Sequence, residues 1–245
     1  MPEDTQNQIK IHSYEISGTH LAELRQVSNE VFHTHSYYVE GLGTNPAILD
    51  IGAHVGIATH YFKHTYPQAT IIAVEPHPIN LKFLEENVAW NRLEGVSVFH
   101  AAVVPASKDP DSKGRETITL YSDAKNEWLS STSIRPNAWN GAQEGMAPIE
   151  VPATTLQDLL DLLPEGKADL VKMDIEGSEW DVLMSATKEL THIKHLLVEY
   201  HPRKDQVLPK LIQHLSQYGL DATVEIHKSR KKLNKLQILE FTQHV

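Results

Sequence analysis

The chain of 245 residues contains no cysteine. It therefore has no disulfide framework, no thiolate nucleophile and no cysteine-ligated zinc site. It also has no apolar run approaching about 18 residues, the length at which a segment becomes a candidate membrane-spanning helix. The first residues, Met1 to Thr5, are polar and do not form the apolar core of a signal peptide. We therefore expect a cytoplasmic protein without a membrane span.

Positive charge is scarce as well. The 22 lysines and arginines are outnumbered by 32 aspartates and glutamates, which gives a formal net charge of -10. Binding to a nucleic-acid backbone requires a positively charged surface, so a nucleic-acid partner is not expected. One basic run, residues 228–232, opposes this balance. We interpret it as a solvated turn between two C-terminal strands.

The chain does have enough apolar residues, 40%, for one sizeable α/β core, and no linker divides it. From residue 45, apolar strand-like runs alternate with helical patterns, which predicts a parallel sheet covered by helices on both faces. Two final runs, 220–226 and 235–241, predict an antiparallel hairpin. The other expected strands are 47–51, 70–75, 96–100, 168–173 and 194–200, and the expected helices are 55–65, 78–91, 177–187 and 204–218.

Two segments do not follow this alternation. Residues 1–44 are interpreted as an N-terminal helical preamble to a domain at 45–245, with a strand-like piece at 9–16 and a helix at 20–33. Residues 105–150 form a long connection that contains Trp128 and Trp139. A connection of this length beside a nucleotide site is typical of a lid or a substrate wall.

A nucleoside site is predicted where the first strand of the alternation meets its helix. The segment from Ala47 to Gly56 runs from an apolar strand through Asp50 and Gly52 into a helix. Its glycines allow a sharp turn close to a ligand. The next strand ends in Glu75, and an acid there can accept hydrogen bonds from both hydroxyls of a ribose. If the glycines served only helix–sheet packing, the two acids at adjacent strand ends would have no explanation.

The same turn distinguishes between two adenosine-containing cofactors. In an NAD site a middle glycine lets the backbone approach the pyrophosphate, and here His54 occupies that position. S-adenosylmethionine has no phosphate but carries an ammonium, a carboxylate and a ribose. Asp50 near the ammonium, Glu75 on the ribose and the amides of residues 52–56 near the carboxylate account for these groups. With the terminal hairpin, the pattern favours S-adenosylmethionine over NAD.

A longer motif lies further along the chain. It reads Leu170-Val171-Lys172-Met173-Asp174-Ile175-Glu176-Gly177-Ser178-Glu179 and is followed by Glu199-Tyr200-His201. Together with residues 49–56, 74–76 and 151–160, this motif resembles the FkbM family of S-adenosylmethionine-dependent methyltransferases, over about residues 45–220. The resemblance implies an α/β fold of the Rossmann-like class I methyltransferase type. Such a fold has a mostly parallel seven-stranded sheet that ends in an antiparallel hairpin.

The resemblance also implies where the ligands lie. Asp174 and Glu176 would face the methyl group and the acceptor, with Asp174 also touching the cofactor. Ala101 and Ala102, with His100 before them, would lie near the adenine. The remaining cofactor contacts would be Asp50, Gly52, Ala53, His54, Gly56, Glu75 and Pro76. The implied acceptor is a hydroxyl of a small molecule, natural product or glycan.

Methyl transfer to a hydroxyl depends on positioning and on removal of a proton. His201 is the expected general base because an imidazole titrates near neutral pH, and Asp174 and Glu176 complete the catalytic candidates. A capping or core role for His201, next to Pro202, is the alternative. A magnesium ion held by Asp174, Glu176 and Glu199 is an alternative that the spacing does not require. Tyr37 and Tyr38, just before the first strand, are expected to close over the cofactor.

Two other functions stay open at this point. The same scaffold could methylate the nitrogen of a peptide or amine. It could also bind an adenosine nucleotide without catalysis, in which case Asp174 and Glu176 would be structural.

Overall fold

The computed structural model describes residues 7–107, 116–123, 146–223 and 237–244. Its strands are β1 (Gln8–Ile11), β2 (Tyr14–Ser17), β3 (Ala47–Ile51), β4 (Thr70–Val74), β5 (Val96–Phe99), β6 (Ala102–Val103), β7 (Thr117–Asp123), β8 (Met146–Thr154), β9 (Ala168–Met173), β10 (Ile193–Tyr200), β11 (Leu220–Thr223) and β12 (Gln237–Gln243). Its α-helices are α1 (Leu21–Ser28), α2 (Ile57–Thr65), α3 (Pro78–Trp90), α4 (Leu156–Leu160), α5 (Glu179–Ser185) and α6 (Leu208–Ser216). Shorter helices are η1 (Asn29–His33), η3 (Pro164–Gly166) and η4 (Lys188–His192).

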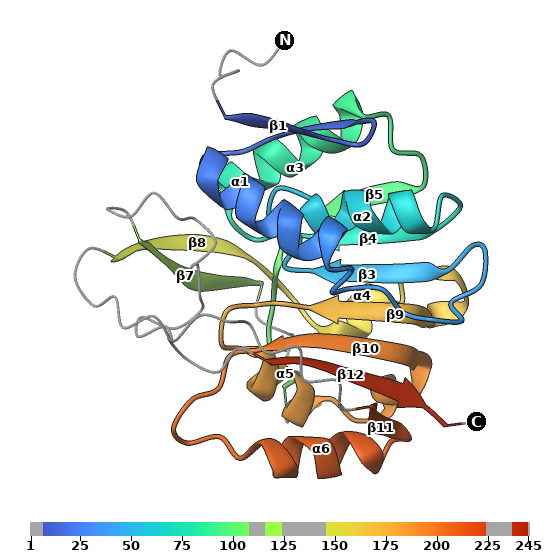
Figure 1. Cartoon of the computed structure of the whole chain (residues 1–245). Helices are drawn as coiled ribbons and strands as arrows, with labels where there is room; N and C mark the ends of the chain where they lie inside the picture. Colours follow the sequence, from blue (N-terminus) through green and yellow to red (C-terminus); the bar gives the residue numbers. More distant parts are fainter. Residues whose placement is uncertain (1–6, 108–115, 124–145, 224–236, 245) are drawn as a thin grey trace.

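A seven-stranded sheet in the order β11-β12-β10-β9-β3-β4-β5 forms the centre of the molecule (Figure 1). Strands β10, β9, β3, β4 and β5 run parallel, whereas β12 is antiparallel to both β10 and β11. The predicted fold class and the predicted C-terminal antiparallel pair are therefore confirmed. The basic turn between β11 and β12, residues 228–232, lies outside the described residues.

The central sheet buries both of its faces, as its continuous apolar strands predict. Alternate residues of β3 show this division: Leu49 and Ile51 pack with residues of α4, α5 and α6, whereas Ile48 packs with residues of α1 and α2. Asp50 and Lys172 are in register on neighbouring strands. Each lies two residues after a residue of the α2-facing cluster, Ile48 and Leu170 respectively, so both side chains project towards α2. The site described below depends on this pairing.

The N-terminal residues differ in detail from the sequence prediction. The strand-like piece at 9–16 is a hairpin of β1 and β2, which turns at His12 in the left-handed region with φ 51°. The helix predicted at 20–33 is α-helical only to Ser28 and continues as the π-helix η1. Asn87 of α3 fixes the hairpin, because its side chain bonds to both the N–H and the carbonyl of Ser17 at 2.9 Å.

The long connection contributes a second sheet. Strand β8 pairs with β6 in parallel and with β7 in antiparallel orientation. In Figure 1 the β7–β8 pair extends beyond the carboxyl ends of the central strands. Trp128 and Trp139 lie outside the described residues. None of the helices that the structure describes has the length and apolar character needed to cross a bilayer.

Candidate active site

A cavity lies at the carboxyl ends of β3, β4 and β9, where ligands bind in open α/β sheets. Apolar side chains from α1, η1 and β7, including Val27, Val31 and Leu120, cover it from the N-terminal segment and from the long connection. The sequence-predicted residues on its wall are Gly52, Ala53, His54, Glu75, Pro76, Ala101, Ala102, Asp174 and Glu176. Asp50, Gly56, His201 and Glu199 are not on the wall.

The turn after β3 requires a glycine at position 52. Gly52 has φ 78°, and a Cβ atom there would lie 1.8 Å from the carbonyl oxygen of Asp174. The backbones that follow β3 and β9 are therefore in direct contact at this point. His54, two residues later, is itself left-handed with φ 53°, a conformation that costs free energy in a residue with a side chain.

Glu75 holds this turn and faces the cavity. Its carboxylate accepts hydrogen bonds from the backbone N–H groups of His54 and His77, both at 2.9 Å. Burial raises its pKa to about 7, although these two N–H groups favour the charged form. The position matches the prediction for an acid at the end of the second strand. Its contact with a ribose stays a proposal.

Asp50 does not meet the expectation of a ligand contact at the strand end. Its side chain is fully buried below the cavity. One oxygen accepts the Thr59 hydroxyl at 2.6 Å, and the other lies 3.4 Å from the Lys172 ammonium. Asp50 therefore neutralises and holds a buried lysine, which the strand register brings beside it.

Gly56 serves packing rather than ligand contact. It has φ 92° and begins α2, and a Cβ atom there would lie 2.8 Å from a methyl carbon of Leu84 on α3. Its carbonyl oxygen lies 2.6 Å from Nδ1 of His60. The sequence allowed helix–sheet packing for the two glycines, but the close contact at Gly56 is between helices α2 and α3, and Gly52 lies on the cavity wall.

Lys172 and Asp174 form the centre of the site. Lys172 is 3% exposed and donates to the carbonyl oxygen of Gly52 at 2.8 Å. Burial lowers its pKa, but the charges of Asp50 and Asp174 outweigh this effect and the net shift is upward. Asp174 places Oδ2 3.8 Å from this ammonium, while its buried Oδ1 has no hydrogen-bond partner. An unsatisfied carboxylate oxygen on a cavity wall is suited to a ligand that donates a hydrogen bond or carries positive charge.

His201, the general base that the sequence predicted, does not lie on the cavity wall. It is 3% exposed, with Nδ1 2.9 Å from Glu179 and Nε2 3.5 Å from Glu176. Burial lowers its pKa, but the two glutamates outweigh burial and raise the pKa to about 10. The ring is an imidazolium at neutral pH and has no free position for a proton. It lies behind the wall as a cationic support for the turn after β9.

That turn is held by a carboxylate, as the turn after β3 is. Glu179 is fully buried and accepts hydrogen bonds from the backbone N–H groups of Ile175 and Gly177 at 3.1 Å. It thereby fixes Glu176, a cavity residue in the left-handed region with φ 53°. Arg203 adds a hydrogen bond to the carbonyl of Gly177 at 2.9 Å.

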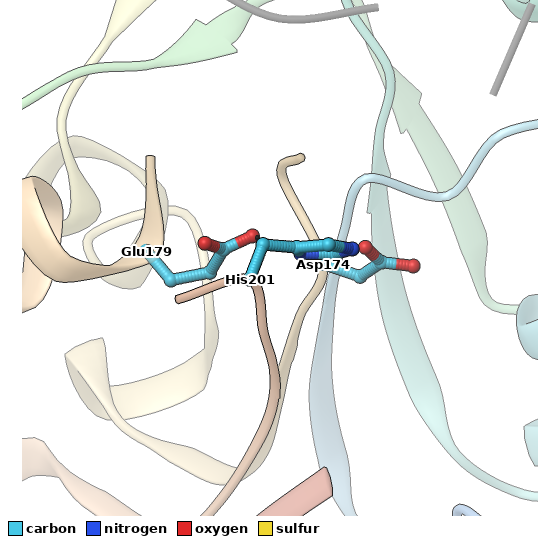
Figure 2. A group of neighbouring side chains, drawn as sticks. All are labelled: Asp174, Glu179 and His201. Carbon is cyan, nitrogen blue, oxygen red and sulfur yellow. Dashed lines mark hydrogen bonds and ion pairs between the residues drawn. The ribbon is translucent and has the colours of Figure 1, made fainter. Parts of the chain in front are cut away.

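The acids do not gather as the magnesium hypothesis requires. Glu199 accepts the Tyr37 hydroxyl at 2.9 Å, away from the cavity wall. Among the described residues, the grouping that could chelate an ion is instead Asp174, Glu179 and His201 (Figure 2). Those donors do not fit a divalent cation, because His201 is protonated, Glu179 already accepts backbone N–H groups, and the Lys172 ammonium adjoins Asp174.

Two important residues were present in the sequence motif without a predicted role. Lys172 could have been recognised, because a lysine inside an otherwise apolar strand needs a buried partner. Glu179 carried no comparable signal, since a glutamate early in a helix is ordinarily exposed and favourable there. Its burial depends on His201, which lies 22 residues away in the sequence.

The charged side chains on the cavity wall fit S-adenosylmethionine better than a phosphate-containing nucleotide. Among the described residues, the cavity wall contains three acidic side chains and one lysine, namely Glu75, Asp174, Glu176 and Lys172. His54 adds no charge, because burial and then the nearby Lys172 lower its pKa to about 4. An excess of negative charge favours a sulfonium with an ammonium group and opposes a pyrophosphate. Ala101, among other apolar residues, offers a surface for a purine.

The comparisons with known proteins agree with this geometry. The Methyltransferase FkbM domain matches residues 50–222. Methyltransferase sdnD of Sordaria araneosa is 31% identical over 219 residues, covering 82% of this chain and 83% of its own. The 31-O-demethyl-FK506 methyltransferase FkbM of Streptomyces tacrolimicus is 23% identical over 234 residues, 86% of each chain.

Among solved structures, methyltransferase FkbM from Methylobacillus flagellatus KT superposes with a TM-score of 0.53 at 16% identity, over 91% of this chain and 52% of that one. At this identity the likeness supports the fold alone. The domain match and the relatives confirm the resemblance seen in the motifs. The chain belongs to the FkbM family of S-adenosylmethionine-dependent methyltransferases.

Proposed function

We propose that this methyltransferase acts on a hydroxyl group of a small molecule, such as a natural product or a sugar. The observation that carries the proposal is Asp174, whose partnerless oxygen lies on the cavity wall beside a glycine turn that fits the methyl donor. The relative from Streptomyces tacrolimicus is by its name an O-methyltransferase, which supports the choice of oxygen as the acceptor atom.

Residues of the first turn would hold the donor. Glu75 would accept hydrogen bonds from the ribose hydroxyls, and the backbone of Gly52 would approach the amino-acid end. Ala101 and Ala102 would contact the adenine. S-adenosylmethionine supplies a methyl group on a positively charged sulfur, from which an oxygen nucleophile displaces a thioether. The carboxylates of the wall stabilise this positive charge before transfer.

Residues of the second turn would position the acceptor. Oδ1 of Asp174 would accept a hydrogen bond from the acceptor hydroxyl and direct its oxygen towards the methyl group. Glu176, held by His201, would bind a neighbouring hydroxyl. Val31 and Leu120 would exclude water from the reacting atoms. The acidic wall and the net charge of -10 support a neutral acceptor rather than nucleic acid.

The test is methyl transfer from labelled S-adenosylmethionine to a panel of alcohols, sugars, amines and peptides, with the product analysed for the methylated atom. We expect O-methyl products from the wild type. Asp174→Asn should lower turnover at least about 100-fold while keeping donor affinity within a few-fold. Asp161→Asn, which changes an exposed carboxylate that accepts a hydrogen bond from Gln157 at the end of α4, is the matched control.

Two results would contradict the proposal in different ways. N-methyl products alone would establish the amine or peptide alternative. Donor binding without transfer to any acceptor, with Asp174→Asn unchanged in affinity, would favour the non-catalytic nucleotide-binding alternative.

A further inference from the structure

Tyr37 connects the cavity to a buried acid that the cavity does not contact directly. It precedes β3 and lies outside the residues matched by the family domain. Tyr37 lies on the cavity wall and is 6% exposed. Its hydroxyl donates to Oε2 of Glu199 at 2.9 Å. The Lys172 ammonium lies 5.7 Å from the ring centroid, so the tyrosine is packed beside the reacting centre.

The surroundings of this pair make a proton acceptor of Glu199. Burial, followed by the negative charge of Asp174, raises its pKa to about 7. Lys172 and His201 face it as cations and, with the Tyr37 hydroxyl, limit the rise. Tyr37 in turn has its pKa raised well above the usual value by burial and by Glu199, Asp174 and Asp50, so it is a neutral phenol.

We propose that Tyr37 and Glu199 form a proton relay that removes the proton from the hydroxyl group being methylated. This inference rests on the proposed O-methylation. The acceptor oxygen forms a bond to the methyl carbon, and the carbon–sulfur bond breaks with its electron pair on sulfur. The acceptor proton passes to the Tyr37 oxygen as the Tyr37 proton passes to Glu199. The products are a neutral ether, a thioether and a protonated Glu199, which returns its proton to solvent after release.

The relay takes the role that the sequence predicted for His201. Both ring nitrogens of His201 lie beside glutamates, whereas Glu199 accepts the hydroxyl of Tyr37, a residue of the cavity wall. Tyr37 is the catalytic residue of the pair, because it lies on the wall. Glu199 acts through it and does not line the cavity.

The variants Tyr37→Phe and Glu199→Gln test the relay. Tyr38→Phe is the matched control, because Tyr38 is 52% exposed and does not lie on the cavity wall. We expect both relay variants to lower kcat for an alcohol about 100-fold or more, while donor affinity stays within about threefold. Below neutral pH the wild-type rate should fall as Glu199 becomes protonated, and this limb should disappear in Glu199→Gln. A more acidic phenolic acceptor should recover much of the loss. Thermal unfolding of each variant verifies the fold.

A second measurement needs no acceptor. Binding of S-adenosylmethionine near pH 7 is measured by calorimetry in two buffers of different ionisation enthalpy, which counts the protons released. The sulfonium should favour the charged form of Glu199, so the wild type should release more protons than Glu199→Gln. Equal release would overturn the assignment of Glu199.

The outcomes separate the relay from the proposed function. O-methylation by the wild type, with both variants equally fast and the pH profile unchanged, overturns the relay and leaves the function standing. Methylation of amines alone overturns both.

Discussion

Two strand-to-helix turns form the floor of the cavity, one after β3 and the other after β9, and they use the same backbone device. Each contains a non-glycine residue at φ 53°, His54 in the first turn and Glu176 in the second. Each is held by a carboxylate: Glu75 accepts the backbone N–H of His54 in the first turn, and Glu179 accepts those of Ile175 and Gly177 in the second. The strained residue in each case lies on the cavity wall.

The two turns differ in where the holding carboxylate points. Glu75 lines the cavity and has no cationic side chain among its hydrogen-bond partners, so it can hold its turn and meet a ligand. Glu179 is fully buried against the His201 imidazolium and can only support its turn. An acid close to a site in sequence is therefore a ligand contact only when the fold leaves one of its oxygens facing the cavity.

The largest expected effect on stability distinguishes Gly52 of the first turn from Gly177 of the second. Gly52→Ala forces a Cβ atom against the Asp174 carbonyl and should lower the free energy of unfolding by more than about 3 kcal/mol. Gly177→Ala, with φ 95° but no atom within 4 Å of the added carbon, should lower it by only about 1–2 kcal/mol. Urea unfolding measures both. Equal losses would show that the contact between the turns is relaxed in solution.

The next largest loss of stability is expected from removing the buried carboxylate of Glu179. Glu179→Gln leaves the His201 charge without its closest partner and should cost about 3 kcal/mol in urea unfolding. Glu86→Gln, which removes a surface pair with Lys82, should change stability by less than about 0.5 kcal/mol. A neutral result for Glu179→Gln would mean that the second turn does not depend on its ion pair.

The two turns should also respond oppositely to pH. His54 has its pKa lowered to about 4, so the unfolded chain binds more protons between pH 4 and 6.5 and stability rises with pH there. His201 has its pKa raised to about 10, so its contribution is complete below pH 6.5 and is lost as pH rises to 10. Each histidine contributes at most about 1.4 kcal/mol per pH unit.

Thermal unfolding is measured across this pH range for the wild type, His54→Gln and His201→Gln. The comparison assigns the acidic and the alkaline part of the stability profile to their histidines. The first variant should lose most of its acidic slope and the second most of its alkaline slope. A His201→Gln variant that keeps the wild-type alkaline slope would show that the imidazolium is not paired as described.

The smallest expected effect concerns the carboxylate that faces the cavity. Glu75→Gln should weaken binding of S-adenosylmethionine about fivefold to tenfold, because an amide replaces the carboxylate acceptor. Calorimetry measures the affinity, and Glu85→Gln on the exposed face of α3 is the control. Unchanged affinity in Glu75→Gln would remove Glu75 from the ribose site.

Several features of the site were predictable because they depend on local pattern. The bounds of β3 and β9 agree with the sequence prediction. Gly52 and Glu75 lie at the predicted strand ends and on the cavity wall. Of the two tyrosines expected to close over the cofactor, Tyr37 lies on the wall and Tyr38 does not. The bond of Tyr37 to Glu199, 162 residues away, was not predicted.

The amino-acid sequence by itself determined the parallel sheet, its terminal hairpin, the family and the strand ends at which the site lies, because hydrophobic period and turn residues act over short distances. Only the tertiary structure decided which acids face the cavity. Asp50 is neutralised by a lysine 122 positions away because β3 and β9 are neighbours in register, and the pKa of His201 is raised because Glu176 and Glu179 lie against it. Charge state and exposure depend on such distant neighbours, which no local pattern specifies.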